Sequence, residues 1–234
     1  MRQKVVGMDD ATAVMKAFHE ISTAFNKAEE DANGSIDEKL AELCDDLDKF
    51  LQFAREDAVR LLNDSSTEMS GTVRPSYMLV SKCGMVCPML MPGMPEDDAE
   101  RALLASCMSA VFQTAPVDAY MFMSEVWMAE VTPSTDAATA KLAPSQRKDR
   151  RECVFIRVSN KTDSKIGIFE ILRGEDRVTL SEANSAPPEA STESPNILMS
   201  NIFDISKRLK KVVDDLSSAQ ESSTKPFGCP DRHN

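Results

Sequence analysis

The sequence predicts an α+β fold in which a five-stranded, mainly antiparallel sheet carries helices on one or both faces. Three consecutive apolar runs bounded by turn residues, at residues 119–129, 152–160 and 165–173, predict most of this sheet. Two further runs, at residues 75–82 and 85–91, flank a short turn and predict a β-hairpin. Long apolar stripes at helical spacing precede and follow these strands, so helices are expected at both ends of the sheet domain.

Two helices are predicted before the sheet. Over residues 10–31, apolar residues recur at spacings of three and four, which is typical of one buried helix face. Asn33 and Gly34 interrupt this pattern because both tolerate positive φ. A second helix follows from Ser35, which forms a capping-box pattern with Glu38. The short break predicts an antiparallel helical hairpin packed on the chain's own sheet, although its second stripe approaches a coiled-coil repeat that another chain would cover.

The predicted β-hairpin contains one strand that does not suit the interior of a sheet. Pro88 lacks the N–H group that a central ladder needs, so its strand is predicted at an edge. The turn before it contains Gly84, which accepts tight backbone conformations. After the hairpin, Pro95 is predicted to open a helix, because acidic residues follow it and suit the positive end of the helix dipole.

These elements divide the chain into five regions. Residues 1–66 are predicted to form an acidic helical hairpin, and residues 67–180 the α+β sheet domain. Residues 181–195 are rich in Ser, Pro, Glu and Ala without periodicity, which is typical of a flexible linker. Residues 196–218 show another helical stripe, and residues 219–234 are expected to form a polar tail.

Composition limits the classes of partner. The chain has 234 residues and a formal net charge of −11, with twelve acids against five bases between residues 27 and 64. An acidic surface repels nucleic-acid backbones and anionic membranes, so we expect a protein partner or self-association. The amino terminus lacks the apolar run of a signal peptide, and no stretch is long enough to span a bilayer. We therefore expect a cytoplasmic protein with reduced cysteines.

The chain offers little of what catalysis and cofactor binding require. Its two histidines, His19 and His233, do not lie beside a serine or cysteine nucleophile in the sequence. No glycine-rich phosphate loop is present. Cys83 and Cys87 have a CxxxC spacing, but even with Cys107 as a third ligand they lack the second pair typical of zinc sites. No cofactor is expected.

The most unusual residue is Glu125, which follows Ser124 inside an apolar strand. Alternation places Glu125 and Trp127 on one face and Ser124 on the other. A carboxylate there must be paired, exposed at an edge or kept neutral. One interpretation places Glu125, Glu152 and Glu170 on adjacent strands around a divalent metal, as in a hydrolase or nuclease. The abundance of nearby arginines favours the other interpretation, a structural Glu–Arg network.

The connection at residues 132–151 is predicted to be a polar arm that ends in the one basic cluster of the chain, residues 146–151. Such a cluster is most often part of a solvated loop. It would also suit a phosphate, an acidic partner, or the protein's own acidic helices. Aromatic residues are absent from the arm, so stacking on nucleic-acid bases is not expected.

Residues 119–128, together with Pro144, Ser145 and residues 149–155, resemble small uncharacterised bacterial and bacteriophage proteins. In those proteins an apolar strand ends in Ser-Glu-Ala-Trp, and a Pro-Ser…Asp-Arg-x-Glu segment leads into the next strand. The resemblance covers about a fifth of the chain, and Val126 stands where alanine is expected. It implies no known activity or catalytic residue.

The resemblance implies that the Ser-Glu-x-Trp strand and the segment 149–152 form one unit. On physical grounds we expect Glu125 to pair with Arg150 or Arg151 and so anchor the arm. The predicted structural residues are Ser124, Glu125, Trp127, Arg150, Arg151 and Glu152.

Scarce catalytic chemistry and long apolar helix stripes predict a non-enzymatic protein-interaction or regulatory protein of bacterial or phage origin. Self-association through a sheet edge or the striped helices is the expected mode. Two other classes stay open: a metal-dependent hydrolase or nuclease that uses the strand carboxylates, and a small-ligand sensor with a pocket between sheet and helix.

Overall fold

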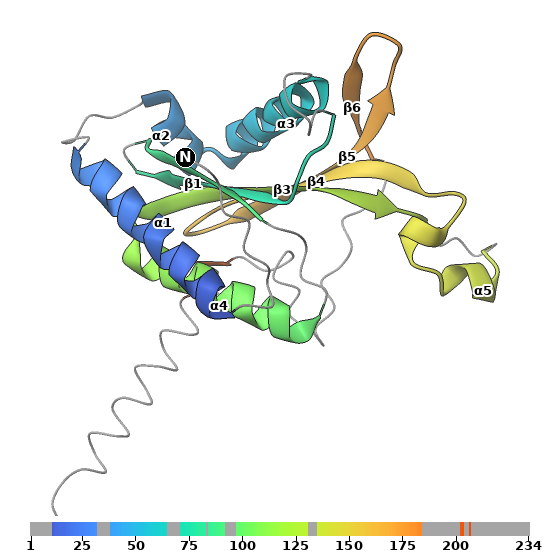
Figure 1. Ribbon diagram of the computed structural model, residues 1–234. Coiled ribbons are helices and arrows are strands. Elements are labelled where there is room, and N and C mark those ends of the chain that lie inside the picture. Colours follow the sequence, from blue (N-terminus) through green and yellow to red (C-terminus); the bar gives the residue numbers. More distant parts are fainter. Residues whose placement is uncertain are drawn as a thin grey trace, which may run out of the picture.

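The chain folds into three layers, with a central antiparallel sheet between two layers of helices (Figure 1). The sheet has six strands in the order β2-β1-β3-β4-β5-β6, and all neighbours are antiparallel. The computed structural model describes residues 11–31, 38–64, 71–82, 84–91, 97–130 and 135–183, together with Ile202, Phe203 and Ser206.

The predicted α+β class and antiparallel sheet are confirmed, but the number of strands is six instead of five. The missed strand crosses the predicted domain boundary at residue 180. It is short and only Leu180 in it is buried, so its alternation is too brief to stand out in the sequence. The strands are β1 (Ser76–Ser81), β2 (Val86–Leu90), β3 (Val117–Met128), β4 (Arg151–Asn160), β5 (Ser164–Arg173) and β6 (Val178–Glu182).

The two amino-terminal helix segments do not pack together as the expected hairpin. Helix α1 (Ala11–Asp31) packs with α4 (Asp98–Thr114) on one face of the sheet. Helices α2 (Glu38–Asp45) and α3 (Leu47–Asn63) cover the other face (Figure 1). An apolar stripe indicates that a helix face is buried, but it does not indicate which side of a sheet buries it.

Two helix boundaries also differ from the prediction. The expected second helix is divided at Asp46, whose carboxylate accepts hydrogen bonds of 3.1 Å from the backbone N–H groups of Asp48 and Lys49. Helix α4 starts after Asp97, which caps it by accepting from Glu100 N at 2.9 Å. The expected helix start at Pro95 lies outside the described residues.

The α1–α4 face of the sheet has an aromatic core. Tyr77 and Phe122 lie with ring centroids 4.8 Å apart, and Phe112 packs 5.3 Å from Tyr120. The described part of the predicted carboxy-terminal helix joins this core. Ile202 N donates to the Tyr120 hydroxyl at 3.1 Å, and Phe203 lies 4.7 Å from Phe112. The rest of that helix, residues 184–195 of the predicted linker and the predicted tail lie outside the described residues.

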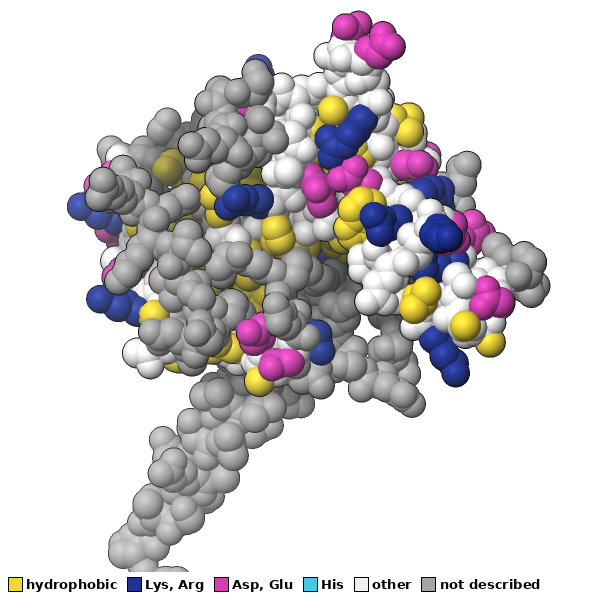
Figure 2. Space-filling view, turned by 45° about the vertical axis from the view of Figure 1, so that its right-hand side comes forward, with side chains coloured by type: hydrophobic (Ala, Val, Ile, Leu, Met, Phe, Trp, Pro, Cys, Tyr) yellow, Lys and Arg dark blue, Asp and Glu magenta, His cyan; other side chains and the backbone are white. Residues whose placement is uncertain are grey.

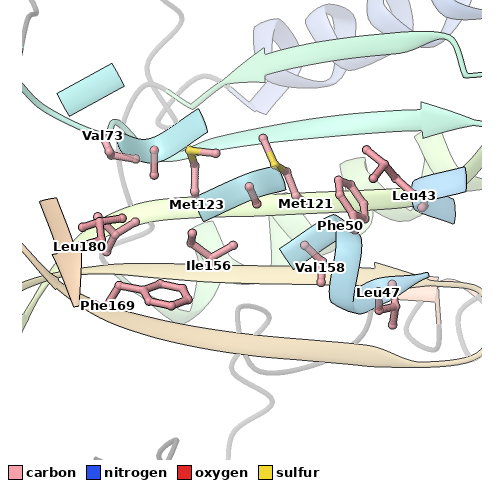
Figure 3. Close-up of a cluster of buried hydrophobic side chains, with 14 of the residues drawn as sticks. Leu43, Leu47, Phe50, Val73, Met121, Met123, Ile156, Val158, Phe169 and Leu180 are labelled. Atoms are coloured by element: carbon pink, nitrogen blue, oxygen red, sulfur yellow. The ribbon is translucent and has the colours of Figure 1, made fainter. Parts of the chain in front are cut away.

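The α3 face has an aliphatic core that fills the space between helix and sheet (Figure 3). Phe50 is 0% exposed and lies over the strands with Met121 and Val158. Ala54 and Ala58 are fully buried as well, and their small side chains let α3 approach the sheet closely. No helix in the described ranges is long and apolar enough to cross a membrane.

Both outer strands of the sheet are protected against strand addition. The strand order confirms the prediction from Pro88 that β2 is an edge strand. Met85 O accepts from Ser81 N of β1 and Met91 N donates to Pro75 O, so the backbone groups of Val86, Pro88 and Leu90 face outward. The central outward residue therefore has no N–H to offer another strand. Edges blunted in this way resist pairing with a second chain.

The β6 edge is covered by side chains of α3. Asn63 accepts from Val178 N and donates to Val178 O, each at 2.8 Å, so its amide takes the place of a neighbouring strand residue. Arg55 donates to Leu180 O at 2.8 Å and lies over the Phe169 ring. These contacts occupy three backbone groups that would otherwise be open to another strand.

Candidate functional site

The residues singled out in the sequence gather at one end of the sheet, where β3 ends and β4 begins. Trp127 lies directly opposite Glu152, and Met128 lies opposite Arg151. Between these strands the chain forms the arm, residues 135–150, which contains α5 (Ala137–Ala140) and the 3₁₀ helix η1 (Pro144–Gln146). In Figure 2 this end comes forward, and Lys and Arg side chains gather with hydrophobic ones on the lobe that the arm forms.

Glu125 anchors the segment before β1. Its Oε1 accepts a 2.6 Å hydrogen bond from Val73 N, and its own N–H donates to Val73 O at 3.1 Å. Burial raises the pKa of Glu125, and the carboxylate of Glu152 adds to this effect, while the Val73 N–H and Arg173 oppose it. Neither Arg150 nor Arg151 makes the ion pair with Glu125 that we expected. The backbone N–H provides the contact instead.

The three strand carboxylates do not come together. Glu125 and Glu152 lie on the α3 face, because they alternate in phase with Met123 and Val154. Glu170 alternates with Phe169, so it lies on the opposite face.

Each of the two β4 and β5 carboxylates has its own arginine. Arg173 holds Glu152 with bonds of 2.9 and 3.1 Å, and Arg151 lies 3.4 Å from Glu170. Among the described residues, no group of three His, Cys, Asp or Glu side chains is placed to hold a metal ion. The arrangement does not assemble the metal centre that the hydrolase interpretation requires.

Trp127 is the exposed aromatic residue of this end of the sheet. Its side chain is 44% exposed, and the Arg150 guanidinium lies 4.7 Å from the ring centroid. Arg150 also donates to the Ser145 carbonyl. A guanidinium stacked on an indole and bonded to the backbone has few free rotamers, so the pair forms a preorganised surface.

The arm that carries Arg150 is held in one conformation by Arg147. This side chain is 3% exposed, and it donates to both oxygens of Asp149 at 3.0 and 2.6 Å and to Glu130 O at 2.7 Å. The hydrogen bonding from Arg147 lowers the pKa of the Asp149 carboxyl. Asp136 caps α5 through Ala138 N and Thr139 N. The arm is therefore an exposed, solvated loop, as its composition suggested, in which the buried Arg147 and the cap on α5 hold the backbone.

Three cations on the arm lack an acidic partner. Lys141, Lys148 and Arg150 are exposed, and no carboxylate of the described residues lies within 4.0 Å of their charged groups. Other exposed cations do have partners, such as Lys49 with Glu42 and Lys161 with Asp118. We define the arm surface as Trp127, Lys141, Leu142, Lys148 and Arg150.

Pockets give little support to the ligand-sensor interpretation. A groove of about 230 Å³ lies between Leu51 of α3 and residues 166–169 of β5. A second hollow of about 570 Å³ is lined only by residues 172–177 and Thr179 of the β5–β6 hairpin. The first is smaller than typical small-molecule sites, and the second draws its walls from a single turn.

Several structural residues were not found from the sequence. Ser124 was singled out; it is buried, and its hydroxyl donates to Glu125 O at 3.1 Å, which is a local role. The missed residues are Val73, Arg147 and Asn63. The β1–β3 register, extended past Ser76, places Val73 opposite Val126 and so next to Glu125, but this register is given by the structure and not by the sequence. The hydrogen bonds of Asn63 to Val178 and of Arg147 to the Glu130 carbonyl join groups distant in sequence, so no local pattern marks them; only the Arg147–Asp149 pair is local.

No family model, no curated protein and no solved structure matches this chain.

Proposed function

We propose that this chain is a non-enzymatic protein-interaction or regulatory protein that binds its partner through the arm surface. The single observation that carries the proposal is the exposed Trp127 beneath Arg150 on an arm fixed by Arg147. Tryptophan and arginine are the residue types that most often dominate binding energy at protein interfaces. A cytoplasmic location is part of the same proposal.

Folding alone does not account for this arrangement. Trp127 is 44% exposed and Leu142 is 45% exposed, so neither contributes a full share of burial to the core. An exposed tryptophan loses part of the hydrophobic stabilisation that it would gain inside the protein. An aromatic residue held rigid at the surface supports recognition, because less conformational entropy is lost when a partner binds.

The arm surface also remains after the other candidate interfaces are considered. The apolar stripes of α1, α3 and α4 are packed against the chain's own sheet. The edges at β2 and β6 are blunted by Pro88 and by α3 side chains. These features favour the arm surface over the sheet edges and helix stripes that the sequence suggested.

The test compares Trp127→Ala and Arg150→Ala with the matched control Leu90→Ala, which removes a similarly exposed side chain (49%) from the distant strand β2. Binding is measured by sedimentation velocity for self-association and by affinity capture from the source organism for other partners. We expect each arm variant to weaken the contact at least about tenfold and the control to leave it unchanged. The proposal fails if the wild type is a strict monomer that captures no protein, or if all three variants bind alike.

A further inference from the structure

We infer that the occupant of the arm surface is a second copy of this chain, which presents the acidic outer face of its α2 and α3. This inference rests on the proposed function and names its partner. The contact joins two different surfaces, so it is head-to-tail. We define the acidic helix face as Glu38, Glu42, Asp45, Asp48 and Glu56, all of which are exposed.

Charge complementarity is the first argument. The segment 135–151 contains five bases and two acids, whereas the segment 38–64 contains eight acids and four bases. The chain as a whole has a formal net charge of −11, so the arm is a basic segment of an acidic protein. Surfaces of opposite sign attract during encounter and disfavour the like-charged alternatives.

The carboxylates of the acidic helix face lie on the solvent side of α2 and α3. The buried side of these helices is apolar, with Leu43, Leu47, Phe50 and Ala54 against the sheet. Within α2, Glu38, Glu42 and Asp45 recur at spacings of four and three and therefore share the opposite, exposed side. Glu38 and Asp45 have no Lys or Arg of the described chain within 4.0 Å, so these two carboxylates are available to another molecule.

Geometry keeps the carboxylates of α2 away from the arm within one molecule. Asn160 Nδ2 donates to Cys44 O at 2.9 Å, which places α2 at the last residue of β4. The arm joins the first residue of the same strand, Arg151. Ten residues of strand span about 30 Å, and Figure 1 shows α2 and α5 at opposite ends of the molecule. At that distance the attraction between exposed charges is screened at physiological salt.

Lys141, Lys148 and Arg150 would therefore meet the α2 carboxylates on another copy of the chain. Trp127 and Leu142 would add apolar contact beside the charges, where the aliphatic parts of Lys and Glu side chains pack well. Because the contact is heterologous, it gives a ring if the rotation closes and an open chain of molecules if it does not.

A charge-exchange experiment tests this pairing. The arm variant carries Lys148→Glu and Arg150→Glu, and the helix variant carries Glu38→Lys and Asp45→Lys. We expect each variant alone to associate at least about tenfold more weakly than the wild type in sedimentation velocity at low salt. An equimolar mixture of the two should associate again, because the intact arm of one meets the intact helix face of the other. Glu175→Lys with Asp176→Lys, on the exposed β5–β6 turn, is the matched control and should associate as the wild type does.

Circular dichroism establishes that every variant is folded before it is compared. The inference is overturned if the wild type stays monomeric at about 100 μM, well above the Kd of weak specific contacts, or if the folded mixture does not associate. It is also overturned if association is unchanged in about 1 M salt, where the screening length is near 3 Å. Failure here does not remove the proposed function: a monomeric wild type that still captures a separate protein, lost in Trp127→Ala, would keep the arm surface and reject only the second copy as its occupant.

Discussion

Substitutions of Glu125 test how the segment before β1 is held to the sheet. Two variants separate the effect of its hydrogen-bond acceptor from the effect of its negative charge. Glu125→Gln keeps an acceptor for Val73 N, whereas Glu125→Ala removes it. Val73 is 2% exposed, so its N–H then loses its partner in a place that water reaches poorly. An unsatisfied buried donor costs about 1–3 kcal/mol, and we expect Glu125→Ala to lower the free energy of unfolding by about 2 kcal/mol.

The glutamine variant should be close to the wild type at neutral pH. Burial raises the pKa of Glu125, which means that the folded protein binds the proton more tightly than the unfolded chain does. The ionised carboxylate therefore destabilises the native state, and this penalty is complete above the folded pKa. It fades as pH falls through the folded pKa and is gone below the unfolded one. Glutamine never carries the penalty, so the wild type should gain stability relative to Glu125→Gln as pH is lowered from 7 to about 4.

Urea unfolding of the three proteins at several pH values measures these differences. Comparing the wild type with Glu125→Gln at each pH cancels other titrating groups, including Asp149, whose lowered pKa acts in the opposite direction. At pH 7 the alanine variant should melt about 4–8 °C lower than the wild type. Equal losses in Gln and Ala would show that the charge, and not the acceptor oxygen, holds Val73, and our reasoning would be refuted.

Two further predictions concern the sheet. Asn63→Ala removes both hydrogen bonds to Val178 and opens the β6 edge. We expect the free energy of unfolding in urea to fall by about 1–2 kcal/mol and light scattering on heating to increase. Unchanged scattering would contradict the protective role of Asn63. Phe50→Ala empties a fully buried site and should cost about 3–5 kcal/mol, whereas Gln52→Ala on the exposed side of α3 should change stability by less than about 0.5 kcal/mol; similar losses would mean that α3 is not packed as described.

Short-range sequence patterns were sufficient to predict most strands of the sheet. Alternation and turn residues predicted β3, β4 and β5 as consecutive strands, and they pair as neighbours in that order. The missing N–H of Pro88 placed β2 at an edge. The stripe of α1 matched the helix observed over Ala11–Asp31. In each case the signal lies within a dozen residues, because it reflects the period of one element and the burial of one face.

The candidate site depended on contacts between distant residues. The sequence identified Glu125 as unusual but not its partner Val73, which lies 52 positions away. One hypothesis from the sequence placed Glu125, Glu152 and Glu170 around a single metal ion. In the structure, alternation along β5 places Glu170 on the opposite face of the sheet from the other two. The sequence predicted the arm as a solvated loop but not the contact that holds it, since the hydrogen bond from Arg147 to the Glu130 carbonyl needs no particular residue type at position 130.

By itself, then, the sequence indicated α1, α4 and five of the six strands, a mainly antiparallel sheet, and one acidic and one basic segment. Tertiary structure alone decided that α1 and α3 cover opposite faces, that α3 protects the β6 edge, and that the basic arm lies about 30 Å from α2. The physical reason is that the period of a sequence pattern shows that one face of a helix or strand is buried or charged. Which other surface that face contacts depends on how the whole chain folds. For this protein, that fold leaves Lys141, Lys148 and Arg150 without a carboxylate of the described residues within 4.0 Å.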